Sequence, residues 1–174
     1  MKAKLAAFLT LTLACGLLVS TARAQATRIE FGGTGGPTGL LDPGTLRITP
    51  SGQVFVRGMV QPTLYEFDAP ELGTADIIIT INFNFQSPDM TGHSWGTFSM
   101  LTQDGSLFEG TWAGQRERVA EDHWISTLKG VGRCVSGPLA GAEFRTVERI
   151  HTFAPLPMDW FSEVEGYLLI PGGD

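Results

Sequence analysis

The stretch ADIIITINFNF, residues 75–85, carries the clearest structural signal in the sequence. Apolar side chains occupy every second position, and such a period of two is typical of a β-strand with one buried face. The residues expected on that buried face are Ile77, Ile79, Ile81, Phe83 and Phe85. Those expected on the opposite face are Ile78, Thr80, Asn82 and Asn84. We therefore predict a long strand whose first face lies in the core.

The same alternation recurs on both sides of this stretch. Beyond the first 24 residues, no long segment has apolar residues at helical spacing. Further strands are predicted at residues 28–31, 44–49, 53–60, 63–68, 94–101, 106–114, 123–131, 142–152 and 164–170. Pro50-Ser51-Gly52 and Asp104-Gly105 are typical of tight hairpin turns. A helical turn is predicted only at residues 154–161, where it would cap one end of the fold.

Glycine residues interrupt many of the predicted strands. They include Gly58, Gly96, Gly110, Gly114, Gly130, Gly132, Gly137 and Gly141. Glycine weakens a flat sheet, whereas a small coiled barrel uses it for bends, bulges and close backbone approach. Barrel closure also removes the free edges of an open sheet. We therefore predict an all-β fold, a closed antiparallel β-barrel of about eight strands, in preference to an open two-sheet sandwich.

Three stretches in the second half of the chain share a further pattern. They read SWGTF (residues 94–98), GSLFEGTWAG (105–114) and GVGRCVSGPLAG (130–141). In these glycines and aromatic residues the chain resembles the allene oxide cyclase-like family of small calycin-type barrels, over residues 92–148. The resemblance implies a barrel fold and, for some members, an isomerase or cyclase that holds an apolar substrate inside the barrel. It assigns no catalytic residue to this chain.

The amino terminus has the pattern of a secretory signal peptide. Lys2 and Lys4 precede an apolar run at residues 5–19, which is too short to span a membrane comfortably. Ala22-Arg23-Ala24 provides the small residues of a cleavage site. We predict that residues 1–24 are removed and that residues 25–174 form one domain, secreted or periplasmic. In a competing interpretation the chain is a lipoprotein that is acylated on Cys15.

Composition restricts the class of protein. With 174 residues, 43% apolar and 17% charged, the chain suits one folded domain rather than a disordered or coiled-coil protein. The formal charge of −6 becomes −9 when Lys2, Lys4 and Arg23 are removed, which argues against nucleic acid as a partner. Cys134 is then the single cysteine, so no intrachain disulfide can form, and we predict a buried thiol rather than a nucleophile.

No stretch of the sequence is predicted to form a familiar catalytic or cofactor site. The glycine-rich residues 32–39 lack the Lys-Ser/Thr of a phosphate loop, and we predict a flexible surface loop there. His93, His123 and His151 lie on or beside different predicted strands without the spacing of a metal site. Residues 92–96 match the pattern Gly-x-Ser-x-Gly, but they lie at the start of a predicted strand rather than at a turn from a strand into a helix, so we expect no nucleophile elbow. We therefore expect no metal and no other cofactor.

Glu148 is the residue that most resembles a functional group. Alternation places it on an apolar strand face, where desolvation raises the pKa of a carboxyl group. The other residues of that face are Phe144, Thr146, Ile150 and Thr152. Such a carboxyl group could act as a general acid or base, or orient a polar ligand atom. Alternatively Glu148 pairs with Arg133 or Arg57, or it lies in water at a barrel mouth. Glu109 is a weaker candidate for a functional carboxyl group.

Small barrels are either filled by side chains or enclose a cavity for one ligand. The candidate ligand-binding residues are Glu148, Trp112, Trp124 and Phe144. We predict a barrel that binds a small apolar or amphipathic ligand, as a monomer or dimer. Two alternatives remain: an isomerase or cyclase that confines an apolar substrate, and a filled barrel that acts as an interaction domain.

Overall fold

The computed structural model describes residues 25–156 and 158–172. The predicted signal peptide, residues 1–24, lies outside the described residues. The described residues form nine strands: β1 (Thr27–Pro37), β2 (Thr45–Ile48), β3 (Gln53–Phe67), β4 (Thr74–Gln86), β5 (Thr91–Thr102), β6 (Leu107–Ala120), β7 (His123–Ser136), β8 (Glu143–Thr152) and β9 (Trp160–Ile170). The described part of the chain contains no helix that is long and apolar enough to cross a membrane.

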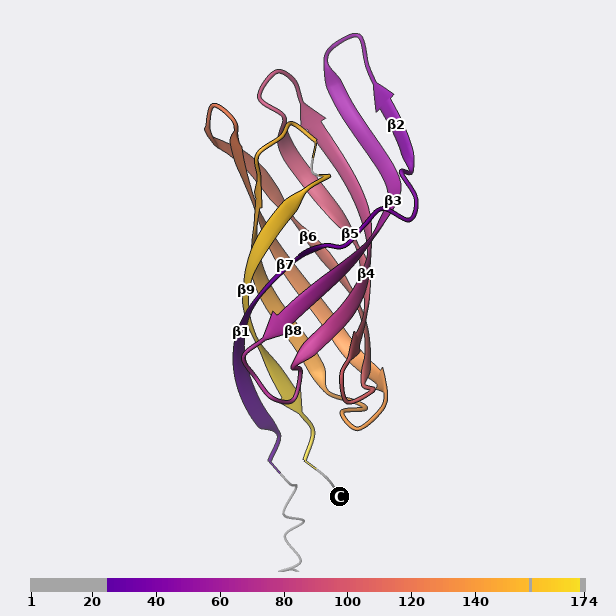
Figure 1. The fold of residues 1–174 in the computed structure, drawn as a ribbon, viewed down its shortest axis with the longest axis vertical. Helices are drawn as coiled ribbons and strands as arrows, with labels where there is room; N and C mark the ends of the chain where they lie inside the picture. The colour runs from indigo at the N-terminus through magenta and orange to yellow at the C-terminus, as the bar shows by residue number, and fades with distance from the viewer. Residues whose placement is uncertain (1–24, 157, 173–174) are drawn as a thin grey trace, which may run out of the picture.

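Eight of the nine strands close into a ring. The antiparallel sheet has the order β1-β9-β8-β7-β6-β5-β4-β3-β2, and an additional β1–β3 pairing joins its ends. β2 lies outside the ring and forms a hairpin with β3 that projects beyond one end, the top of Figure 1. The antiparallel barrel of about eight strands that the sequence predicts is therefore confirmed.

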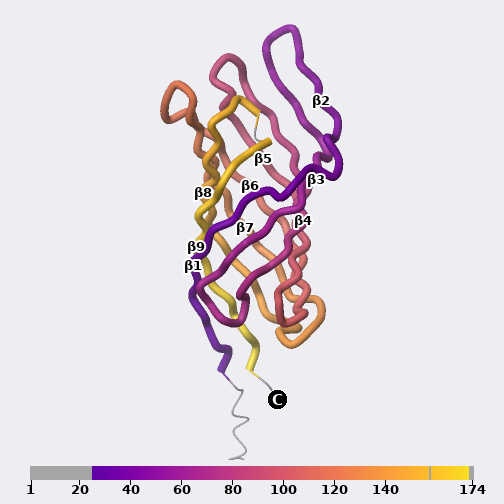
Figure 2. Tube along the Cα trace, in the orientation of Figure 1, coloured from indigo at the N-terminus to yellow at the C-terminus, as the bar shows by residue number. Residues whose placement is uncertain are grey.

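The glycine-rich segment closes this ring. Residues 32–37 belong to β1 rather than to the predicted surface loop, and β1 runs diagonally from β9 to β3 (Figure 2). Gly35 is the register partner of Tyr65, and a Cβ atom on Gly35 would lie 2.5 Å from the Tyr65 ring. The loop prediction is wrong because these glycines serve by their small size, which lets β1 lie close to β3 along the seam between the two strands, and not by their flexibility.

β3 unites two strands that the sequence predicts separately. Its register with β4 shifts between Val56 and Met59, where Gly58 has a positive φ of 69°. The extra residue is a β-bulge, one of the uses of strand glycines in a small barrel. The bend lets one half of β3 pair with β2 and the other half pair with β1.

The inward face of β4 is the face that the alternation predicts. Ile77, Ile81, Phe83 and Phe85 are buried, and Ile79 is half-buried. Ile78 on the outside is 42% exposed. The interior holds two apolar clusters. The lower cluster, at the end where the described chain begins and stops, includes Phe31, Phe67, Phe108 and Phe144; the upper cluster includes Val56, Phe83, Phe85 and Trp124.

The connection between β8 and β9 lies at the upper end (Figure 1). Its described residues form bends and a turn, so the predicted helical turn is wrong. Leu156 packs against the upper cluster. Arg116, which is buried, donates hydrogen bonds to Thr152 Oγ1 (2.7 Å), Ala154 O (2.9 Å) and Pro155 O (2.6 Å). The segment therefore caps this end of the barrel without a helix.

Cys134 is a buried free cysteine. Its Sγ donates to the carbonyl oxygen of Ser136 at 3.1 Å, and burial raises the pKa of the thiol. A raised pKa keeps the thiol protonated and unreactive. The structure thus agrees with the expectation of a buried thiol rather than a nucleophile.

Candidate functional site

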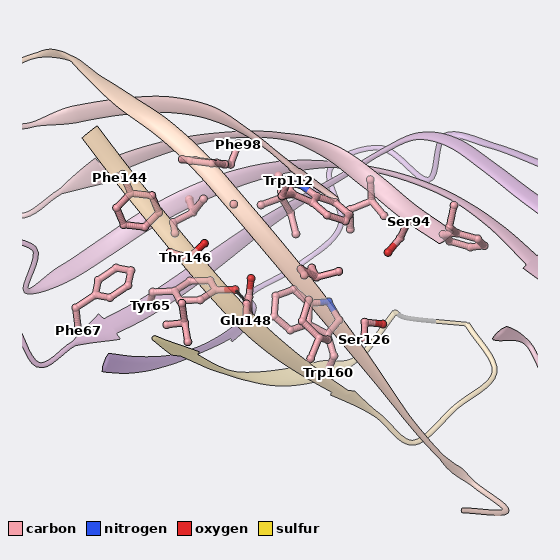
Figure 3. A pocket seen from close by; sticks show the side chains of 18 of the residues that line it. Tyr65, Phe67, Ser94, Phe98, Trp112, Ser126, Phe144, Thr146, Glu148 and Trp160 are labelled. Atoms are coloured by element: carbon pink, nitrogen blue, oxygen red, sulfur yellow. Dashed lines mark hydrogen bonds between the residues drawn. The ribbon is translucent and has the colours of Figure 1, made fainter. Parts of the chain in front are cut away.

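The barrel contains an internal cavity of about 80 Å³ (Figure 3). Most of its lining is aromatic or aliphatic, and the lining residues are Tyr65, Phe67, Ile77, Ile79, Ile81, Phe83, Phe85, Ser94, Phe98, Trp112, Ser126, Leu128, Gly130, Phe144, Thr146, Glu148, Ile150, Trp160 and Val164. For comparison, an apolar cavity of about 150 Å³ binds benzene. The interior is therefore neither completely filled nor wide enough for a large guest without side-chain movement.

Glu148 projects into this cavity from β8. Its position follows from the strand alternation, which also turns Thr146 and Ile150 toward the lining. Its register partners are Leu128 on β7 and Val164 on β9, both buried. Apolar neighbours cannot solvate a charged carboxylate, so burial raises the pKa of Glu148. The predicted inward orientation of Glu148 is confirmed.

Tyr65 is the hydrogen-bond partner of Glu148. Its hydroxyl group donates to Glu148 Oε1, and Ser162 Oγ donates in turn to the Tyr65 hydroxyl oxygen at 3.2 Å. Burial and the neighbouring Glu148 charge raise the pKa of Tyr65 well above its ordinary value, so the phenol stays protonated. This hydrogen-bonded chain joins β9, β3 and β8 and fixes the orientation of the carboxyl group.

The expected alternatives for Glu148 do not occur. Arg57 donates instead to Val56 O (2.7 Å), Phe83 O (2.8 Å) and Asn84 Oδ1 (2.6 Å), and Arg133 is exposed. Glu148 is half-buried and lines the internal cavity between the buried Leu128 and Val164, so the carboxyl group does not lie in water at a mouth. Neither the ion pair nor the mouth position is correct. Opposite charge alone favours an ion pair, but the strand register directs Arg57 and Arg133 away from Glu148.

The structure brings three of the four predicted binding residues together. Glu148, Trp112 and Phe144 line the cavity (Figure 3). Trp124 is not among the lining residues; it packs in the upper cluster, and its Nε1 donates to Asp89 O at 2.6 Å. Trp124 faces inward but lies nearer the end of the barrel than Leu128 on the same strand. Whether these residues bind a ligand stays a prediction.

Sequence reasoning missed Tyr65, Trp160 and Ser162. Tyr65 lies within the predicted strand at residues 63–68, where the alternation of Thr63, Tyr65 and Phe67 indicates an inward face. Trp160 lies within the predicted helical turn at 154–161, and Ser162 lies between that turn and the predicted strand at 164–170. The observed β9 begins at Trp160 and carries both side chains into the barrel.

Two other candidates lie outside the cavity lining. Glu109 is exposed on β6. His123 Nε2 and His151 Nδ1 lie 3.1 Å apart, closer than the sequence suggests. Even so, the described residues contain no group of three or more His, Cys, Asp or Glu side chains arranged to hold a metal ion. The cavity is thus the strongest candidate site.

Comparisons with known proteins assign no family. Neither the protein-family models, nor the curated proteins, nor the solved structures contain a match to this chain. The resemblance to the allene oxide cyclase-like family stays a prediction that rests on the three sequence stretches quoted above. Function is therefore argued from the geometry of the cavity.

Proposed function

We propose that the barrel binds a small, mainly apolar molecule that carries one polar group. The supporting observation is a cavity with aromatic and aliphatic walls into which the Glu148 carboxyl group projects, held by Tyr65. Small-molecule sites typically combine apolar walls with a few fixed polar groups. The walls provide affinity, and the carboxyl group selects the orientation of the ligand.

The volume of the cavity restricts the ligand. About 80 Å³ is roughly half of the space that accommodates benzene, so a molecule of about three non-hydrogen atoms fits without movement, and one of about five enters when lining side chains shift. Isobutanol is a suitable probe because it has a compact apolar skeleton and a single hydroxyl group. A larger natural ligand would require lining side chains such as Ile79 and Ile150 to move.

Titration with isobutanol tests the proposal. Trp112 and Trp160 line the cavity, so their fluorescence should change saturably as it fills. In the Ile79→Phe variant the added ring occupies the cavity, and we expect at least about tenfold weaker binding. Ile78→Phe makes the same change on the outer face and should bind as the wild type does. Unsaturable wild-type fluorescence, or equal binding by both variants, would contradict the proposal.

A second candidate function is proton transfer on a bound substrate. A carboxyl group whose pKa is raised by burial, beside a protonated phenol, has the properties of a general acid or base. The family resemblance implies an isomerase or cyclase, which agrees with such chemistry. Incubation with butanone in D₂O would show it, because the wild type should accelerate deuterium incorporation next to the carbonyl group. An equal rate with Glu148→Gln would exclude this role.

We also propose that the protein is exported through the predicted signal peptide. Intact-mass analysis of material exported by a bacterial host should give a chain that begins at Gln25. A mass that retains residues 1–24, or a diacylglyceryl group on Cys15, would contradict cleavage after Ala24.

A further inference from the structure

The Glu148 carboxyl group uses only part of its hydrogen-bonding capacity. Oε1 accepts the Tyr65 hydrogen bond, and Ser162 is the second hydrogen-bonding neighbour of the carboxyl group among the described residues. A carboxylate can accept about four hydrogen bonds. The group therefore retains acceptor sites that a ligand in the cavity could occupy.

No positive charge faces Glu148 from the described residues. None of the described residues that line the cavity is lysine, arginine or histidine. On β8 itself Arg145 and Arg149 alternate to the outside and are exposed. On the flanking strands Lys129, Glu163 and Glu165 are likewise exposed.

Arg116 is the buried cation of the upper end, but it is committed elsewhere. Its guanidinium group binds oxygens of Thr152, Ala154 and Pro155 and is not part of the cavity lining. Its carbon Cζ also lies 5.0 Å from the ring centroids of both Phe85 and Trp124. The carboxylate in the cavity thus lacks a counter-ion among the described residues.

Aromatic rings surround the same space. Tyr65 and Trp160 lie on either side of Glu148 along the cavity, and Trp112 and Phe144 line it further out (Figure 3). The faces of aromatic rings attract cations, most strongly when water is excluded. A carboxylate between aromatic rings is therefore complementary to an alkylammonium ion and repels an anion.

We propose that the ligand is a small alkylamine, bound as its ammonium ion with an N–H group donating to Glu148 and its alkyl group against the apolar walls. This inference rests on the proposed function, since it assigns a chemical class to the ligand of the same cavity. An alcohol would satisfy a hydrogen bond but leave the buried carboxylate charge unpaired, which is unfavourable. A carboxylic acid ligand would place a second negative charge beside the first.

Three probes with one carbon skeleton test the inference at pH 7.5: isobutylamine, isobutanol and isobutyrate. We expect isobutylamine to bind at least about tenfold more tightly than isobutanol, as charge-assisted hydrogen bonds allow. Isobutyrate should show no saturable binding. Glu148→Gln should abolish the preference for the amine while isobutanol still binds. Glu109→Gln removes an exposed carboxyl group and should leave every affinity unchanged.

The outcomes separate the two proposals. Equal affinity for isobutylamine and isobutanol overturns the amine inference but leaves the proposed function intact, whereas saturable binding of none of the probes overturns both.

The wild type alone provides a second test if Glu148→Gln fails to fold. Lowering the pH to 4.5 should weaken isobutylamine binding at least about tenfold, because Glu148 becomes protonated, and leave isobutanol binding unchanged. A preference that does not depend on pH overturns the inference.

Discussion

At the scale of single residues, two opposing effects determine the charge of Glu148. Burial disfavours the carboxylate, and hydrogen bonding with Tyr65 and Ser162 favours it. The desolvation effect is the larger, so the pKa of Glu148 in the folded barrel is raised. In the unfolded chain a glutamate has a pKa of about 4.3. The folded protein therefore keeps this proton to a higher pH than the unfolded chain does.

This difference predicts how stability depends on pH. Below the unfolded pKa both states are protonated, and Glu148 makes no ionisation-linked contribution. As the pH rises from there through the raised folded pKa, the unfolded state loses its proton first, so the free energy of unfolding falls. Glu148→Gln should therefore become more stable relative to the wild type as the pH rises above about 4, until the raised folded pKa has been passed, as urea unfolding would measure.

A control variant isolates this effect. Glu109→Gln removes a carboxyl group that water already solvates on the outer face. Its stability relative to the wild type should not change over the same pH range. If Glu148→Gln behaved in the same way, burial of the Glu148 carboxyl group would not control its ionisation.

Residue-scale reasoning predicts which way Glu148 points but not what it contacts. The period of two in its own strand is sufficient to turn the side chain inward. Its partner Tyr65 lies 83 residues away in sequence. The two meet because β1 brings β3 and β9 together, and no local pattern contains that information.

At the scale of strands, alternation is informative only where side chains differ between the two faces. β4 has apolar residues on its inner face and is predicted almost to its observed ends. β1 contains glycines at 32, 33, 35 and 36, which have no side chains to mark a face. Its second half is therefore detectable only from its pairing with β3 and β9.

The seam between β1 and β3 provides a prediction at this scale. In Gly35→Ala the new methyl group would meet the Tyr65 ring, so either the seam opens or the ring shifts away from Glu148. We expect a loss of about 1–3 kcal/mol in the free energy of unfolding, the usual cost of overpacking. Urea unfolding measures this loss.

Gly39→Ala is the matched control for the seam. Its added Cβ would lie 3.6 Å from Pro62 Cγ, an ordinary contact. Its stability should stay within about 0.5 kcal/mol of the wild type. Equal stability of the two variants would show that the seam tolerates a side chain at position 35.

At the scale of the whole molecule, the two ends of the barrel are constructed differently. The lower end is filled by aromatic residues around Phe144. At the upper end, Arg116 and Gln61 hold the β8–β9 connection through backbone oxygens. Burial lowers the pKa of Arg116 to about 10, so it is still charged at neutral pH. The upper end is therefore held in part by the polar side chains of Arg116 and Gln61, whereas aromatic packing fills the lower end.

Arg116→Met tests this dependence. The apolar side chain retains packing but loses the hydrogen bonds to Thr152, Ala154 and Pro155. We expect proteolytic cleavage within the β8–β9 connection to become at least about tenfold faster, since local opening costs less free energy. Arg118→Met, an exposed change two residues further along β6, should leave the cleavage rate unchanged. Equal rates for Arg116→Met and the wild type would assign the stability of this end to apolar packing.

Ring closure also makes the linear order of the strands dispensable. Thr27 at the start of β1 and Ile170 at the end of β9 are register partners, so their backbones lie about 5 Å apart. A linker of a few residues can therefore join them, and the chain can be opened instead at the exposed turn near Ser51. A circularly permuted gene would encode the same neighbours around the ring, because each strand depends on what it pairs with and not on when it is synthesised.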